Sequence, residues 1–118
     1  MISYNPSTGD ILCSTRTTTG TIITIPAGRA WSGNIFISAS VTSLTTATPR
    51  VSVSGANAEP ADTTIIHQLS VSGLAAVATH GEGVSEVIVR APAGNSVTLE
   101  FNTGGATSAS VSVTGFLL

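Results

Sequence analysis

The side chains best suited to chemistry in this sequence are two histidines and one cysteine. His67 and His80 stand 13 positions apart on different predicted elements, and neither has a second ligand at a metal-binding spacing. We interpret His67 as a partly buried or interface residue of a strand. His80 precedes Glu82 in a stretch that we interpret as a solvated loop tip, with a cation shared between subunits as the alternative. Cys13 is the only cysteine, so no intramolecular disulfide forms.

Nucleophilic and acid–base catalysis find no support in the spacing of the remaining residues. The 16 serines include no Gly-x-Ser-x-Gly turn, and the acids show no context that would pair two of them for general acid and base work. There is no lysine, which excludes Schiff bases, phosphate-binding loops and lysine cross-links. The sequence therefore predicts a protein that is not an enzyme, with no catalytic residue, cofactor or metal.

The low charge restricts the possible partners. Charged residues make up 8% of the 118 residues, and the four basic ones are scattered arginines in a chain of net charge −2. Such a chain has no basic face for phosphates, and it has no apolar run of about 20 residues for a membrane span, so we expect neither nucleic acid nor membrane as partner. Serine and threonine supply 34 residues, and mean hydropathy is +0.42. A hydroxyl-rich surface with little repulsion favours self-association.

The elements that must position these residues are strands. Apolar and polar residues alternate repeatedly, as in Ser32–Thr42, where Ile35, Ile37, Ala39 and Val41 share one face. Proline and glycine fall between the alternating stretches, where they suit turns. The sequence predicts an all-β protein, an antiparallel β-sandwich or jelly roll of about eight short strands. The predicted strands are 20–25, 32–42, 50–55, 63–72, 84–90, 96–102 and 110–118, with a weak one at 74–78 that is alternatively a short helical turn.

The chain divides into a polar N-terminal arm or edge segment, residues 1–19, and a β domain, residues 20–118. The arm has one short apolar stretch around Ile11, and we expect it either to fray or to dock on a neighbour. Its start has no charged and apolar pattern of a signal peptide, so we expect folding in a cytoplasm. The chain ends in Phe116, Leu117 and Leu118, which we expect to be buried in a final core strand or against a partner subunit.

Trp31 has two interpretations. It follows a turn and precedes Gly33, so it either projects from a loop onto a ligand such as a sugar ring or caps the end of the core, which we favour. The candidate interface residues are the large apolar or aromatic side chains of the arm and the chain end together with this tryptophan: Ile2, Tyr4, Ile11, Leu12, Trp31, Phe116, Leu117 and Leu118.

Several features together resemble small bacteriophage virion proteins that form β-sandwich or jelly-roll trimers on capsids or in tails and fibres. They are the Ser/Thr/Gly/Ala/Val-rich strands, the Pro-Ala-Gly turns at 26–28 and 92–94, the closing stretch 111–116 and the polar arm. No specific motif carries the resemblance. It implies a non-enzymatic capsid decoration or stabilising protein, located in the virion and assembled in the host cytoplasm. Its partners would be copies of itself, with a trimer favoured, and a major capsid protein or other virion protein, held noncovalently.

Two other functions remain open on the sequence. One is a receptor- or glycan-binding module of a phage tail or fibre, which would use exposed aromatic side chains. The other is a structural subunit of a cell-surface or coat assembly, such as a pilus or spore coat.

Overall fold

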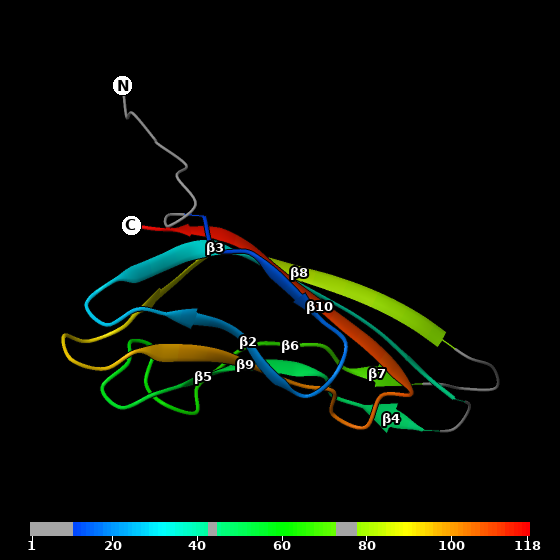
Figure 1. The fold of residues 1–118 in the computed structure, drawn as a ribbon. Helices are drawn as coiled ribbons and strands as arrows, with labels where there is room; N and C mark the ends of the chain where they lie inside the picture. Colours follow the sequence, from blue (N-terminus) through cyan, green and yellow to red (C-terminus); the bar gives the residue numbers. More distant parts are fainter. Residues whose placement is uncertain (1–10, 43–44, 73–77) are drawn as a thin grey trace.

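A computed structural model describes residues 11–42, 45–72 and 78–118, and these form an all-β fold. Its ten strands make two four-stranded sheets and one two-stranded sheet, and all pairings are antiparallel (Figure 1). In the part of the chain that the structure describes, no helix has the length and apolar character needed to span a membrane.

The first sheet contains the three longest strands. Its order is β1 (Ser14–Arg16), β10 (Ser108–Leu117), β3 (Ala30–Val41) and β8 (Ala78–Arg90). β3 and β10 pair along ten consecutive positions, from Ser40 opposite Ser108 to Trp31 opposite Leu117. This uninterrupted register keeps the alternation of both strands in phase, so each strand turns one set of side chains toward the core and the other outward.

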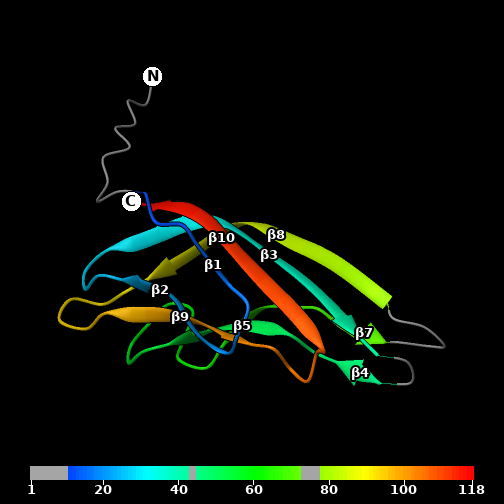
Figure 2. The same cartoon turned by 45° about the vertical axis from the view of Figure 1, so that its right-hand side comes forward.

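The second sheet lies beneath the first, as Figures 1 and 2 show. Its order is β2 (Gly20–Ile25), β9 (Val97–Asn102), β5 (Arg50–Ser54) and β6 (Ile65–Gln68). The two-stranded sheet, β4 (Thr46–Ala47) with β7 (Val71–Ser72), lies at one end of the layers. Apart from the β5–β6 pair, no two strands that follow each other in the chain are neighbours in one sheet.

One hydrophobic core receives side chains from both large sheets. Ile35, Ile37, Ala39 and Val41 of β3 are all buried, as the alternation predicts. From the second sheet they meet residues such as Val51, Val53, Val97, Leu99 and Phe101. Valine, isoleucine and leucine dominate, and Trp31 and Phe101 are the largest fully buried side chains. Branched side chains of this kind pack well on pleated surfaces.

The predicted strands at 20–25, 32–42, 50–55, 96–102 and 110–118 are confirmed to within a few residues. The predicted strand 63–72 is two strands, β6 and β7, and the short strands β1 and β4 were not predicted as separate elements. The weak strand or helical turn at 74–78 lies almost entirely outside the described residues.

The interpretation of residues 79–86 as a loop tip is wrong. These residues belong to β8, which pairs with β3 from Ala78 to Arg90. The reason is that Gly81 and Gly83 have no side chains, so the alternation of apolar and polar residues that indicates a strand is absent at these positions. Across the pair they lie opposite Ser38 and Phe36.

The N-terminal segment 1–19 is in part an edge strand. Ser14–Arg16 pairs with β10, and Ile11 forms a bridge with Phe116. The Arg16 guanidinium then closes the turn into β2 by donating to the carbonyl oxygens of Thr18, Thr19 and Thr21 at 2.7, 3.0 and 3.1 Å. Residues 11–16 are therefore built into the first sheet.

Candidate binding face

The outer face of the first sheet carries the candidate site, and its residues fall into rows set by strand register. One row contains Ile11, Phe116, Ser32 and Ile88, which are cross-strand partners from four different segments. The row at Phe36 contains Ser112 and Gly83. Cross-strand partners lie on the same side of a sheet about 5 Å apart, so each row is a continuous line of side chains.

This face has almost no charge. Neither β3 nor β10, the two central strands, contains a charged residue. The second sheet differs, because its central strands contain Glu100 and Arg50, and the Thr21 hydroxyl donates to the Glu100 carboxylate at 2.6 Å. Charged side chains on a sheet normally oppose association. Burying the outer face of the first sheet against a partner therefore costs less desolvation free energy than burying that of the second.

One end of this face is apolar, and we call Ile11, Phe116, Ile88 and Leu118 the apolar end. Ile11, Ile88 and Leu118 expose 44%, 45% and 57% of their surface, and Phe116 is half-buried. Leu118 is held in place because its N–H donates to the Ala30 carbonyl oxygen at 2.8 Å. Large apolar side chains gathered in this way mark an interaction surface more strongly than single exposed ones do.

Phe36 stands in the middle of the face and exposes 49% of its surface. Its ring extends across the neighbouring strand above two glycines. A Cβ built on Gly81 would lie 2.7 Å from the Phe36 Cζ atom, and one on Gly83 would lie 3.2 Å from its Cδ2 atom. The absence of side chains at these two positions is what allows the ring to lie down on β8.

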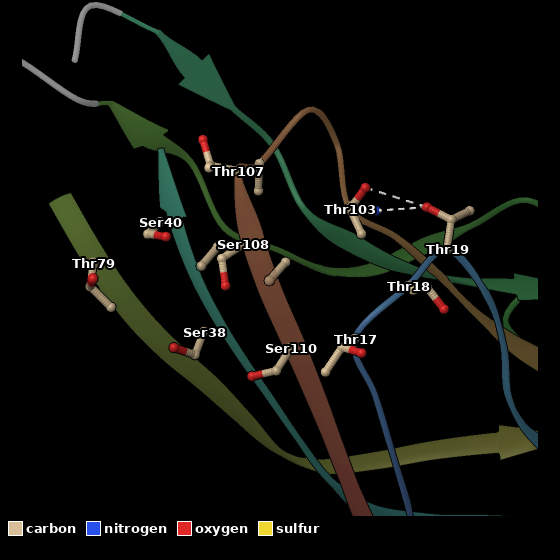
Figure 3. A pocket seen from close by; sticks show the side chains of 13 residues that line it. Thr17, Thr18, Thr19, Ser38, Ser40, Thr79, Thr103, Thr107, Ser108 and Ser110 are labelled. Atoms are coloured by element: carbon tan, nitrogen blue, oxygen red, sulfur yellow. Dashed lines mark hydrogen bonds between the residues drawn. The ribbon is translucent and has the colours of Figure 1, made fainter. Parts of the chain in front are cut away.

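The other end of the face is a groove lined by hydroxyl groups, shown in Figure 3. It has a volume of about 580 Å³, and of the thirteen described residues that line it ten are Ser or Thr and three are Ala. Ser40 is the cross-strand partner of both Ser108 and Thr79, and Ser38 is the partner of Ser110. We call this the hydroxyl groove. A smaller hollow of about 250 Å³ beside Phe36 continues it along the face.

The wall and the floor of the groove differ in their hydrogen bonds. On the wall, the Thr19 hydroxyl accepts from the Thr103 N–H at 3.2 Å, and the Thr107 hydroxyl accepts from the Thr42 N–H at 3.1 Å. On the floor, the hydroxyls of Ser38 and Ser110 form no hydrogen bond within the part of the chain that the structure describes. The floor hydroxyls are therefore available to a ligand.

Trp31 is not an exposed interface residue, and that prediction is wrong. It is fully buried (0% exposed) on the inner side of β3. The ring lies against Gly115, where a Cβ would stand 2.7 Å from it, and its Nε1–H donates to the Leu12 carbonyl oxygen at 3.1 Å. Because the ring is buried, Trp31 cannot stack on a ligand. The favoured interpretation, a place in the core, agrees with this burial.

The other predicted interface residues divide by position. Ile11, Phe116 and Leu118 belong to the apolar end, whereas Leu117 is buried in the core, where its alternation in β10 places it. Leu12 is half-buried and packs on the core. Ile2 and Tyr4 lie outside the described residues. The expectation that the chain end is buried thus holds for Leu117 and not, within one chain, for Leu118.

Phe36 and Ile88 were missed by the sequence reasoning, although a signal existed. Phe36 alternates with Ile35 and Ile37, which were assigned to the core, so it had to point the other way. Ile88 lies between Val87 and Val89 in the predicted strand 84–90, and the same alternation would have separated it from them.

The two histidines lie on different sheets and differ in burial. His67 is buried in β6, and its Nε2 lies 2.8 Å from the Glu82 carbonyl oxygen of β8, so that this nitrogen donates across the open edge of the two sheets. His80 and Glu82 are exposed on β8. Among the described residues, no three His, Cys, Asp or Glu side chains gather closely enough to hold a metal ion.

In comparisons with known proteins, no family model matches this chain, and no curated protein is significantly similar to it.

Proposed function

We propose that this protein is a non-enzymatic structural protein that forms homo-oligomers and stabilises a larger symmetric assembly, most simply a virus capsid, by noncovalent contacts. The observation that carries the proposal is the outer face of the first sheet, whose two central strands carry no charge, together with its apolar end. Three apolar side chains in one row, Ile11, Phe116 and Ile88, offer a second copy of the chain a surface with little polar desolvation cost.

We further propose that the fold is a jelly roll, one form of β-sandwich. Two four-stranded antiparallel sheets that share one core support this, as does the strand order, in which the connections β1–β2, β2–β3, β8–β9 and β9–β10 each pass from one of these sheets to the other. Jelly rolls of eight strands occur in viral capsid proteins and in lectins. Fold alone does not establish function, so this likeness adds support only as an analogy.

The segment that precedes the apolar end is the proposed contact with the capsid. Residues 14–16 pair with β10 and Ile11 bridges to Phe116, so the described chain begins at the apolar end, next in sequence to residues 1–10. A contact of this kind can be weak and still give high occupancy, because it is repeated at every equivalent position of a symmetric shell.

The self-association test uses two isoleucines of nearly equal exposure. Ile88 exposes 45% in the first sheet, and Ile65 exposes 49% on the second. Sedimentation equilibrium should give a multiple of 11.8 kDa for the wild type. Ile88→Ser should raise the dissociation constant about tenfold or more, since burying one such side chain contributes about 1.5–3 kcal/mol. Ile65→Ser should leave the mass unchanged. A monomeric wild type at all concentrations refutes the oligomer.

The capsid contact is tested separately by removing residues 1–10 and measuring occupancy on intact shells. The deletion stops before Ile11 so that the edge strand and the Trp31 hydrogen bond stay in place. We expect lower occupancy with an unchanged oligomeric mass. Full occupancy by the shortened protein would show that the arm makes no contact with the shell.

A further inference from the structure

We propose that the hydroxyl groove and Phe36 together form a binding site for a neutral oligosaccharide. This function is separate from self-association, because the groove and the apolar end occupy opposite ends of the same face. Phe36 stands between them.

The first argument is the posture of Phe36. The ring lies over Gly81 and Gly83, so one side of it rests on β8, and 49% of the residue remains exposed. The face of an aromatic ring carries partial negative charge and attracts the weakly positive C–H groups of a sugar ring. An aromatic side chain held flat on two glycines is a platform of this kind, whereas an exposed Phe without such support would be free to turn.

The second argument is the arrangement of hydroxyl groups beside that platform. Ser38 and Ser110 are cross-strand partners in the row next to Phe36, and Ser40, Ser108 and Thr79 form the following row. Rows on one face repeat about every 6.6–6.8 Å, and strands lie about 4.8 Å apart, so the floor offers a two-dimensional array of donors and acceptors. Each hydroxyl donates one hydrogen bond and accepts others, as the hydroxyls of a sugar do.

The third argument is charge. No residue that lines the groove is ionisable, and neither is any that lines the hollow beside Phe36. A phosphate, a sulfate or an acidic sugar would find no positive partner here, and transferring its charge from water would be unfavourable. The ligand that fits is polar, uncharged and extended, because the two hollows adjoin along the strands and together exceed the size of a single-ring pocket.

The experiment titrates the isotope-labelled protein with maltotetraose, cellotetraose and chitotetraose, each to about 20 mM, and follows the backbone amides by NMR. At least one saccharide should shift the amides of Ser38, Gly81, Gly83 and Ser110, with a dissociation constant in the millimolar range. Phe36→Ala should weaken that binding about tenfold or more, and Ile65→Ala should leave it unchanged, since Ile65 is equally exposed on the other sheet.

A second variant tests the posture of the ring. Gly81→Ala keeps the phenyl group but places a methyl under its end, so the ring must lift, and saccharide binding should weaken with little change in thermal stability. Absence of shifts with all three saccharides overturns the proposal, and so do shifts located away from the groove. A loss of oligomeric mass in Phe36→Ala without any saccharide binding would instead assign Phe36 to self-association. Binding that survives in the monomeric Ile88→Ser variant would uphold this inference even if the oligomer fails.

Discussion

Replacing Trp31 with phenylalanine is expected to weaken the core and to release the edge segment at the apolar end. Trp31 is fully buried, and its Nε1–H is the donor that holds the Leu12 carbonyl oxygen at 3.1 Å. Loss of this hydrogen bond costs about 1 kcal/mol. A phenyl ring buries about 40 Å² less apolar surface than an indole, which adds about 1 kcal/mol at ~25 cal/mol per Å². The free energy of unfolding should therefore fall by about 2 kcal/mol.

Two measurements separate the global effect from the local one. Urea unfolding should show the loss of stability, and the melting temperature should fall by about 8 °C for a chain of this length. Hydrogen exchange should show the Leu12 amide, which donates to the Gly115 carbonyl oxygen at 3.0 Å, losing more protection than the amides of β9.

Phe101→Leu is the matched control, because Phe101 is equally buried but belongs to the second sheet, far from Leu12 in register. It should lower global stability by about 1 kcal/mol without a selective effect on Leu12. The reasoning is refuted if Trp31→Phe has the stability of the wild type, or if Leu12 exchanges no faster than the global unfolding of the variant requires.

Substitutions at Gly33, Gly83 and Arg16 test the packing and the turn described above. Gly33→Ala would drive a methyl into the Thr114 carbonyl oxygen and the Trp31 ring, neither of which can retreat, so we expect a loss of about 3 kcal/mol in urea unfolding. Gly83→Ala places a methyl 3.2 Å from the Phe36 ring and 3.4 Å from the Ile35 carbonyl oxygen, which requires only a small shift of the ring, and should cost less than about 1 kcal/mol. Equal losses in the two variants would contradict the assigned contacts. Arg16→Ala removes three hydrogen bonds to the carbonyl oxygens of Thr18, Thr19 and Thr21 and should lower stability by about 2 kcal/mol after allowance for solvent, with Arg16→Lys recovering only part of it because an ammonium group cannot span three acceptors. Full recovery in the lysine variant would show that charge, and not the planar fork, closes this turn.

The strand-rich class and much of the core followed from alternation alone. In β3 the period of two assigned Ile35, Ile37, Ala39 and Val41 to the core, and all four are buried. Alternation predicted residues 84–90 of β8 but failed in its first half, where Gly81 and Gly83 hide the pattern. A register shift separates the halves, because Val84 and Val87 of β8 lie opposite Ile35 and Gly33 of β3. From the sequence alone, a glycine within a strand predicts a turn. Only the position of the neighbouring strand reveals which side chain fills the space above the glycine.

The candidate site was less accessible to sequence reasoning than the fold. The apolar chain end was noticed, and a place for Trp31 in the core was favoured but left beside a place on a ligand-binding surface, whereas Phe36 was not considered. A single Trp next to a turn has no periodic partner that defines its face. Only the register of β3 with β10 shows that Trp31 lies inward over Gly33 and Gly115.

By itself, the sequence determined that this is a hydroxyl-rich, all-β chain with few charges and without the residues for lysine chemistry or an internal disulfide, since those properties depend only on which residues are present and on local alternation. The tertiary structure decided which strands are neighbours. It is strand pairing that brings Ile11 beside Phe116, Phe36 over two glycines of β8, and serines of β3 and β10 into one groove. These residues are separated by tens of positions in the chain. Local backbone preferences depend only on neighbouring residues, so they cannot determine which distant strands pair.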